Sequence, residues 1–160
     1  MNLFLLNDSH NWAMYTYTNL TELKYEFKKR KITIGANCAF GENCQLNNNI
    51  KIGANCTFGK NCTIRSYAKI GGNCTFGENC TIDYRAVVLS NVCVGKFVVL
   101  GAESLVGESA KIGNYCIVKV GATVAPLGVT EEFELYTNAE AVPYRHTGFQ
   151  KLLHDISKLY

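Results

Sequence analysis

Long apolar runs are absent from this chain of 160 residues. No stretch approaches the roughly 20 apolar residues that a membrane-spanning helix needs, so we expect no membrane partner. The opening segment 1–6 lacks a basic lead and is soon followed by Asn7 and Asp8, which is atypical of a secretory signal. The net charge of +3 is too small to indicate specific nucleic-acid binding. These features together predict a cytoplasmic protein.

Metal-ligating clusters are also missing. The eight cysteines include no Cys-X-X-Cys pair and form no cluster with histidine. Seven of them share one phase of a six-residue period, which suits small buried side chains. We therefore expect reduced cysteines that fill a core, and neither a metal site nor a disulfide framework.

The sequence does contain a strict six-residue repeat. Every sixth residue from Ile34 to Val124 is apolar, in sixteen successive hexads without a slip. Glycine usually follows this anchor, and a small residue, most often cysteine, lies four positions after it. Blocks of eighteen residues that begin at Ile34, Ile52 and Ile70 also match one another closely. A repeat of this kind predicts stacked coils of three short strands each.

Each hexad is expected to form one strand and one corner. The anchor points inward and its neighbours point outward, because side chains alternate along a strand. Asparagine often lies three residues after the anchor, where a corner needs a positive φ; these residues are Asn37, Asn43, Asn55, Asn61, Asn73, Asn79 and Asn91. The predicted fold is all-β, a parallel β-helix of about five coils over residues 34–129.

The hexad Ile52-Gly53-Ala54-Asn55-Cys56-Thr57 and most others resemble the hexapeptide-repeat superfamily of the bacterial-transferase type. The resemblance covers about 95 residues and implies a left-handed parallel β-helix, commonly a trimer. Most enzymes of this superfamily are acyltransferases that use a histidine as general base. Others are carbonic anhydrases that hold a metal with three histidines.

The chain departs from these enzymes in three ways. The repeat contains no histidine, since His10, His146 and His154 all lie outside it, and no loop interrupts it. The tail Leu135–Val142 is similar to one found in many acetyltransferases but lacks its proline and lysine, which argues against coenzyme A. His146 is the candidate base, in trans across a subunit boundary. A surface or capping histidine is the interpretation that we favour.

Three regions follow from these patterns: a cap at 1–31, the β-helix at 32–129 and a tail at 130–160. The cap is expected to hold short strands at 3–6 and 12–17 and a helix that Asn19 and Glu22 begin with a capping box. The basic run 28–31 indicates a solvated helix end, with an anionic partner as the alternative. The tail is expected to be extended at 131–136 and to end in an amphipathic α-helix from Thr147.

Outward positions are polar in the first coils and turn apolar in the last ones. The apolar positions lie on two adjoining faces, and a contiguous patch of this kind is typical of an interface; they are Val87, Leu89, Val99, Leu105 and Ile117. Burial under the C-terminal helix is the alternative. We expect a homotrimer closed through this patch.

Aromatic and guanidinium groups gather at one corner of two successive coils. Arg65, Tyr67, Asp83, Tyr84 and Arg85 are the predicted ligand-binding residues, because such groups clamp an anionic or planar ligand. A solvated corner with an Arg–Asp pair is the alternative.

Three functions fit the sequence. We favour a non-catalytic trimer that needs no cofactor and binds a protein partner or sequesters a small, anionic or nucleotide-like ligand between subunits. An O- or N-acyltransferase that uses coenzyme A is the first alternative. A structural assembly subunit similar to the small β-helical subunits of dynactin is the second.

Overall fold

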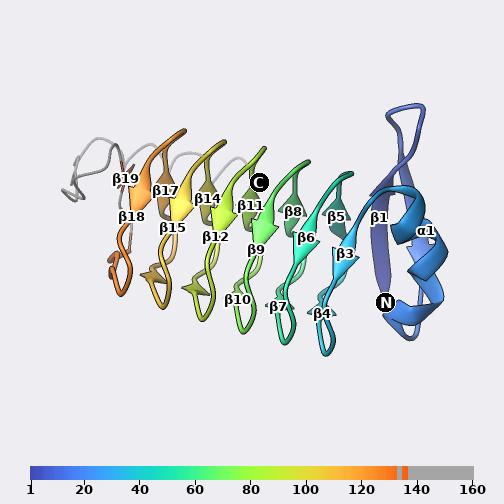
Figure 1. Ribbon diagram of the computed structural model, residues 1–160, viewed down its shortest axis with the longest axis horizontal. Helices are drawn as coiled ribbons and strands as arrows, with labels where there is room; N and C mark the ends of the chain where they lie inside the picture. Colours follow the sequence, from blue (N-terminus) through green and yellow to red (C-terminus); the bar gives the residue numbers. More distant parts are fainter. Residues whose placement is uncertain (133–134, 137–160) are drawn as a thin grey trace, which may run out of the picture.

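The computed structural model describes residues 1–132, 135 and 136. Short parallel strands stack along one axis and form the three faces of a prism (Figure 1). Face one consists of β3 (Thr33–Ile34), β6 (Lys51–Ile52), β9 (Lys69–Ile70), β12 (Val87–Val88), β15 (Leu105–Val106) and β18 (Thr123–Val124). Face two consists of β4 (Ala39–Phe40), β7 (Thr57–Phe58), β10 (Thr75–Phe76), β13 (Cys93–Val94) and β16 (Lys111–Ile112).

Face three includes the cap and the last described strand. Its coil strands are β5 (Cys44–Leu46), β8 (Thr63–Ile64), β11 (Thr81–Ile82), β14 (Val99–Leu100) and β17 (Ile117–Val118). The hairpin β1 (Asn2–Leu6) and β2 (Trp12–Thr16) extends this sheet at one end, and β19 (Leu135–Tyr136) extends it at the other. The predicted parallel β-helix of about five coils is confirmed.

The strand register repeats every eighteen residues, as the sequence predicts. Ile34 pairs with Ile52, and Ile52 pairs with Ile70. Each anchor therefore stacks on its counterpart in the next coil. On face two the rings of Phe40, Phe58 and Phe76 are nearly parallel, with centroids 4.8 Å apart in both steps. These columns form one continuous buried core.

The cysteines belong to this core and carry no disulfide. Seven thiols donate hydrogen bonds to backbone carbonyls of the next coil; the Cys56 Sγ, for example, lies 3.1 Å from the Gly71 carbonyl oxygen. Cys93 differs, because it lies on the outer side of face two and is exposed. The other seven cysteines therefore pack in or against the core, as the repeat predicts.

Every hexad turns its corner through the left-handed backbone region. The fourth residue of all sixteen hexads has a positive φ between 56° and 69°. Eight of them are asparagines, and six of these form side-chain hydrogen bonds that link successive coils; Asn55 Nδ2, for example, donates to Asn73 Oδ1 at 3.0 Å. Tyr67 and Arg85 adopt the same conformation without asparagine's advantage, which costs about 1 kcal/mol each.

Where glycine follows the anchor, the next coil approaches it closely. A Cβ atom added to Gly59 would lie 2.6 Å from the backbone nitrogen of Glu78. At Gly41 the corresponding distance to the Lys60 nitrogen would be 2.5 Å. Because backbone atoms are the obstacle at these two corners, a larger residue there would require the neighbouring coil to shift.

The N-terminal cap contains the predicted hairpin and capping box. Strand β1 pairs with β2 on one side and with β5 on the other, so it covers the edge of face three. A 3-10 helix, η1 (Leu20–Leu23), begins at Asn19, whose side chain and that of Glu22 form the capping box. The helix α1 (Lys24–Lys29) follows directly and ends at Arg30.

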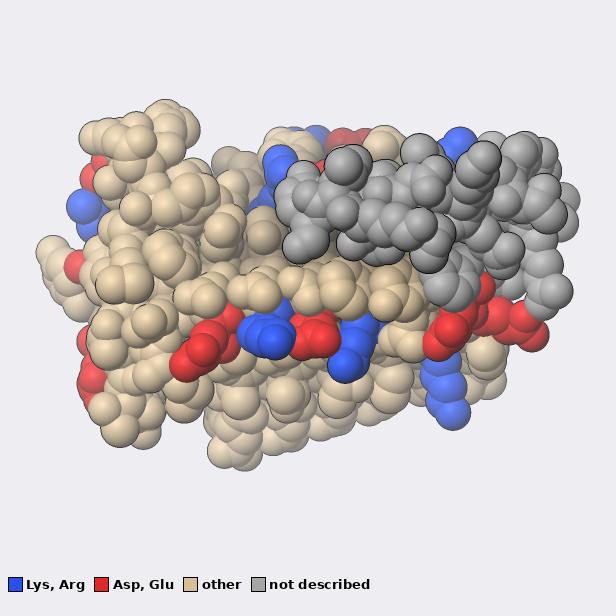
Figure 2. All heavy atoms as spheres, turned by 180° about the vertical axis from the view of Figure 1, so that it is seen from behind, with Lys and Arg blue, Asp and Glu red and all other residues tan. Residues whose placement is uncertain are grey.

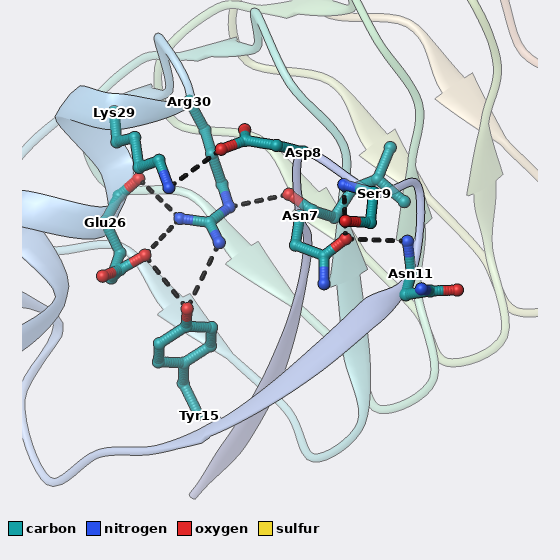
Figure 3. A network of polar contacts seen from close by, with 9 residues as sticks. Asn7, Asp8, Ser9, Asn11, Tyr15, Glu26, Lys29 and Arg30 are labelled. Atoms are coloured by element: carbon teal, nitrogen blue, oxygen red, sulfur yellow. Dashed lines mark hydrogen bonds and ion pairs between the residues drawn. The ribbon is translucent and has the colours of Figure 1, made fainter.

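Arg30 corrects our interpretation of the basic run. Its side chain is only 4% exposed and is surrounded by acceptors from three elements (Figure 3). Its Nε donates to the Leu6 carbonyl oxygen at 2.7 Å, and its Nη atoms donate to the Glu26 carboxylate and the Tyr15 hydroxyl. Arg30 thus joins α1 to the hairpin, whereas Lys29 pairs with Asp8 at the surface.

The predicted C-terminal helix and the tail residues after Tyr136 lie outside the described residues. Among the residues that the structure does describe, no helix has the length and apolar character to cross a bilayer. The extended segment expected before the helix is present in part, since β19 pairs in parallel with β17.

Candidate ligand-binding site

The five predicted ligand-binding residues lie together at the corner between faces three and one. Tyr67 and Arg85 occupy equivalent corner positions of neighbouring coils. The Tyr67 and Tyr84 rings are in an edge-to-face arrangement with centroids 5.6 Å apart, and the Arg85 guanidinium lies 5.0 Å from the Tyr84 ring centroid. Arg65 and Asp83 approach to 3.5 Å.

Charge at this corner is largely balanced within the chain. Arg65 pairs with Asp83, and Arg85 reaches Glu103 at 3.5 Å. Both pairs are about half exposed, so each contributes little to stability. The Arg–Asp pair is the one that we considered as an alternative to a ligand site. The cluster alone therefore does not account for binding of an anion.

A basic groove lies beside this corner on face one. It has a volume of about 500 Å³. Tyr67 and Arg85 of the predicted cluster line it, together with residues that the sequence analysis did not assign to a site: Lys31, Asn49, Lys51, Lys69 and Val87. Lys31 comes from the end of the cap, whereas Lys51 and Lys69 are the outward residues of β6 and β9.

The three lysines of the groove bring positive charge together without an ion-pair partner in the described part of the chain. Lys51 and Lys69 are direct partners on adjacent strands, where like charges repel. Within the described part of the chain, neither of them nor Lys31 makes an ion pair, and no carboxylate lines the groove. An arrangement that destabilises the free protein in this way is typical of a site for an anion.

Another edge of the prism shows the opposite arrangement. There Glu78 pairs with Lys60 at 3.4 Å and with Lys96 at 3.2 Å. The Lys96 ammonium holds the pKa of the Glu78 carboxyl below its usual value. Figure 2 shows acidic and basic side chains alternating along the molecule in this manner. Opposite charges on neighbouring coils can therefore pair in this repeat. The lysines of the basic groove lack such carboxylate partners among the described residues, which distinguishes the groove from this edge.

An apolar depression of about 400 Å³ adjoins the basic groove, and Lys69 and Val87 line both. Leu89 also lines it, so two of the five predicted interface residues lie there. Leu89 and Leu105 are 41% and 36% exposed, whereas Val87, Val99 and Ile117 are half-buried. Val87, Val99, Leu105 and Ile117 lie in strands of faces one and three, and Leu89 directly follows β12 on face one.

Catalytic groups are scarce among the described residues. His10 lies in the exposed turn of the hairpin and does not line the basic groove. His146 lies outside the described residues. No cluster of three metal-ligating side chains occurs in the part of the chain that the structure describes.

Comparison with known proteins agrees with the repeat. The model of the bacterial transferase hexapeptide family (six repeats) matches residues 31–66. The same period and the same strand register continue through β18. Residues 31–66 thus carry the hexapeptide repeat of that family. No curated protein matches the sequence significantly.

Solved structures of an N-acyltransferase share this fold at low sequence identity. A point mutant of AntD, an N-acyltransferase from Bacillus cereus, in complex with dTDP and coenzyme A, has a TM-score of 0.67 at 16% identity, over 82% of this chain and 86% of that one. AntD in complex with dTDP and 3-hydroxybutyryl-CoA has a TM-score of 0.62 at 18% sequence identity, over 84% of this chain and 95% of that one. Another AntD mutant, in complex with dTDP-4-amino-4,6-dideoxyglucose and coenzyme A, has a TM-score of 0.59 at 17% sequence identity, over the whole of both chains.

Proposed function

We propose that this protein is a β-helical prism that binds a phosphate-bearing small molecule in the basic groove on face one. The observation that carries the proposal is the uncompensated charge of Lys31, Lys51 and Lys69 beside Arg85. Ammonium and guanidinium groups donate charge-assisted hydrogen bonds, which phosphate oxygens accept. Tyr67 and Tyr84 supply aromatic faces next to these donors, so a ligand with both phosphate and a planar ring fits the groove and its corner.

Binding without chemistry is the simpler reading of this groove. Its described lining contains no histidine or carboxylate to act as a general base. Hydrophobic patches next to it support a homotrimer in which a neighbouring subunit closes the groove. The ligand would then be sequestered between two prisms.

Calorimetric titration with dTDP, inorganic pyrophosphate and coenzyme A tests the proposal. The double variant Lys51→Gln/Lys69→Gln should weaken binding of the probe by tenfold or more, because each charge-assisted hydrogen bond contributes roughly 1.5–3 kcal/mol. The control Lys111→Gln/Lys119→Gln removes the same charge from exposed positions outside the groove. Equal affinities for the two variants, or no binding of any probe by the parent, would refute the proposal.

The free protein supplies a second readout. Removing Lys51 and Lys69 relieves their repulsion, so the double variant should be as stable as the parent or more stable in the absence of ligand. A marked loss of stability would instead assign the two lysines a structural role.

N-acyl transfer is the second candidate, because AntD structures with this fold hold coenzyme A and dTDP. In that reaction the acceptor amine bonds to the acyl carbon, the carbon–sulfur bond breaks, and the coenzyme leaves as a thiol. Incubation with acetyl-coenzyme A and dTDP-4-amino-4,6-dideoxyglucose should then release thiol, and His146→Ala should abolish the release if that residue is the base. Thermal stabilisation by dTDP without any thiol release would favour binding alone.

A further inference from the structure

At the N-terminal end of the prism, a further strand extends face three only. Strand β1 pairs with β5 and completes face three. Strands β3 and β4 are instead the last strands of their sheets and pair on one side only. Such an edge presents backbone donors and acceptors that another strand can pair with.

Two inward residues of the first coil are only partly covered at this end. Ile34 and Cys38 are half-buried, although they occupy inward positions of the repeat. Their counterparts one coil further, Ile52 and Cys56, are 3% and 0% exposed. The first coil therefore lacks the cover that each later coil receives from its predecessor.

A groove of about 1040 Å³ lies between this coil and the segment formed by η1 and α1. Leu20, Phe27 and Phe40 contribute its apolar lining. Its charged side chains are Lys24, Lys28 and Lys31, and no Asp or Glu among the described residues lines it. None of these lysines makes an ion pair within the described residues.

We propose that this groove binds an extended, acidic segment of a partner protein, which adds a strand beside β3. The β4 edge is less available, because the Tyr17 hydroxyl already donates to the Phe40 carbonyl oxygen at 3.4 Å. Alternate side chains of the added strand would cover Ile34 and Cys38, and the intervening carboxylates would pair with the lysines. This site is independent of the basic groove on face one, although Lys31 borders both.

Selection from a displayed library of random nonapeptides tests the proposal. The bait carries Cys93→Ser, so that Cys38 is the only thiol that remains partly accessible. Selected peptides should alternate apolar residues with Asp or Glu. A selected peptide should slow modification of Cys38 by a maleimide at least tenfold, because the added strand covers it. The variant Lys24→Glu/Lys28→Glu should lose binding, and the control Lys111→Glu/Lys119→Glu should keep it.

Several results would overturn the proposal. No enrichment of any peptide, enrichment of peptides without carboxylates, or binding that leaves Cys38 reactive would each do so. Protection of Cys38 that rises with protein concentration alone would instead assign the groove to a second copy of the chain. Retained binding by the charge-reversed variant would remove the role of the lysines.

Discussion

At the scale of single residues, the six-residue period assigns each side chain one place and one task. The anchor fills the core, glycine permits close coils, the fourth residue turns the corner, and the cysteine thiol donates to the next coil. Cysteine suits that last place because it is small and its sulfur tolerates the long hydrogen bond. Neutral thiols are therefore part of the folded structure.

This role predicts a loss of stability at alkaline pH. Burial raises the pKa of the Cys56 thiol from its usual 9.0 to about 11, and burial also raises the pKa of Cys74. Between these pH values the thiol ionises in the unfolded chain and stays protonated in the folded one. The contribution of the Cys56 thiol to the free energy of unfolding is complete below pH 9 and is lost as the pH rises toward 11. The loss is on the order of 2 kcal/mol.

The measurement is urea unfolding of the parent and of Cys56→Ser/Cys74→Ser from pH 7 to 11. Serine keeps a donor of similar size and does not titrate in this range. The stability difference between the two proteins should shrink as the pH rises. A difference that stays constant with pH would show that these thiols do not titrate on unfolding.

At the scale of elements, Arg30 joins the hairpin and the helix of the cap. The guanidinium binds the Leu6 carbonyl oxygen, the Tyr15 hydroxyl and Glu26, and its hydrogen bond to Glu26 holds the pKa of that carboxyl below its usual value. These partners come from β1, β2 and α1, so one side chain fixes the angle between the hairpin and the helix (Figure 3).

Arg30→Met should therefore destabilise the cap by about 3 kcal/mol, because Glu26 and the Leu6 carbonyl lose their partner. Hydrogen exchange should speed up at amides of β1 and β2 first and reach the central coils least. Lys29→Met, which removes an exposed pair with Asp8, is the matched control and should change little. Equally faster hydrogen exchange in the cap and in all coils would contradict a role of Arg30 that is confined to the cap.

The sequence predicts elements well where the period governs them. Strand positions, the eighteen-residue register, the inward columns and the asparagine corners all follow from one repeat. The capping box at Asn19 follows from a local rule. The burial of Arg30 was not predictable in this way, because it depends on Leu6 and Tyr15, which are distant in sequence and meet only in the folded cap.

The candidate site shows the same limit. The period brings Arg65, Tyr67, Asp83, Tyr84 and Arg85 together, and it also stacks Lys51 on Lys69. Those two lysines were recognisable as outward residues eighteen positions apart. Lys31 was not, because it precedes the repeat and joins the groove through the path of the chain out of α1. Whether the groove holds a ligand remains a prediction.

At the scale of the whole molecule, the apolar patch predicts assembly. We expect Val87, Leu89 and Leu105 on face one, with Val99 and Ile117 on face three, to form the surface that a closed trimer buries. Light scattering should give three times the mass of the 17.7 kDa chain. Val99→Glu/Leu105→Glu should give monomers, whereas Tyr25→Glu, at an exposed position on α1, should not. A monomeric parent would favour an assembly subunit instead.

The eighteen-residue register also determines how this all-β chain can fold. Most β proteins pair strands that are far apart in sequence, and they fold slowly because long loops must close first. Here each strand of a coil pairs with the corresponding strand one coil away. The chain segment that must close to form such a pair is therefore one coil, or eighteen residues, long. Folding can begin at any coil and proceed to its neighbours. Completed coils can therefore assemble during synthesis, before the last residues have left the ribosome.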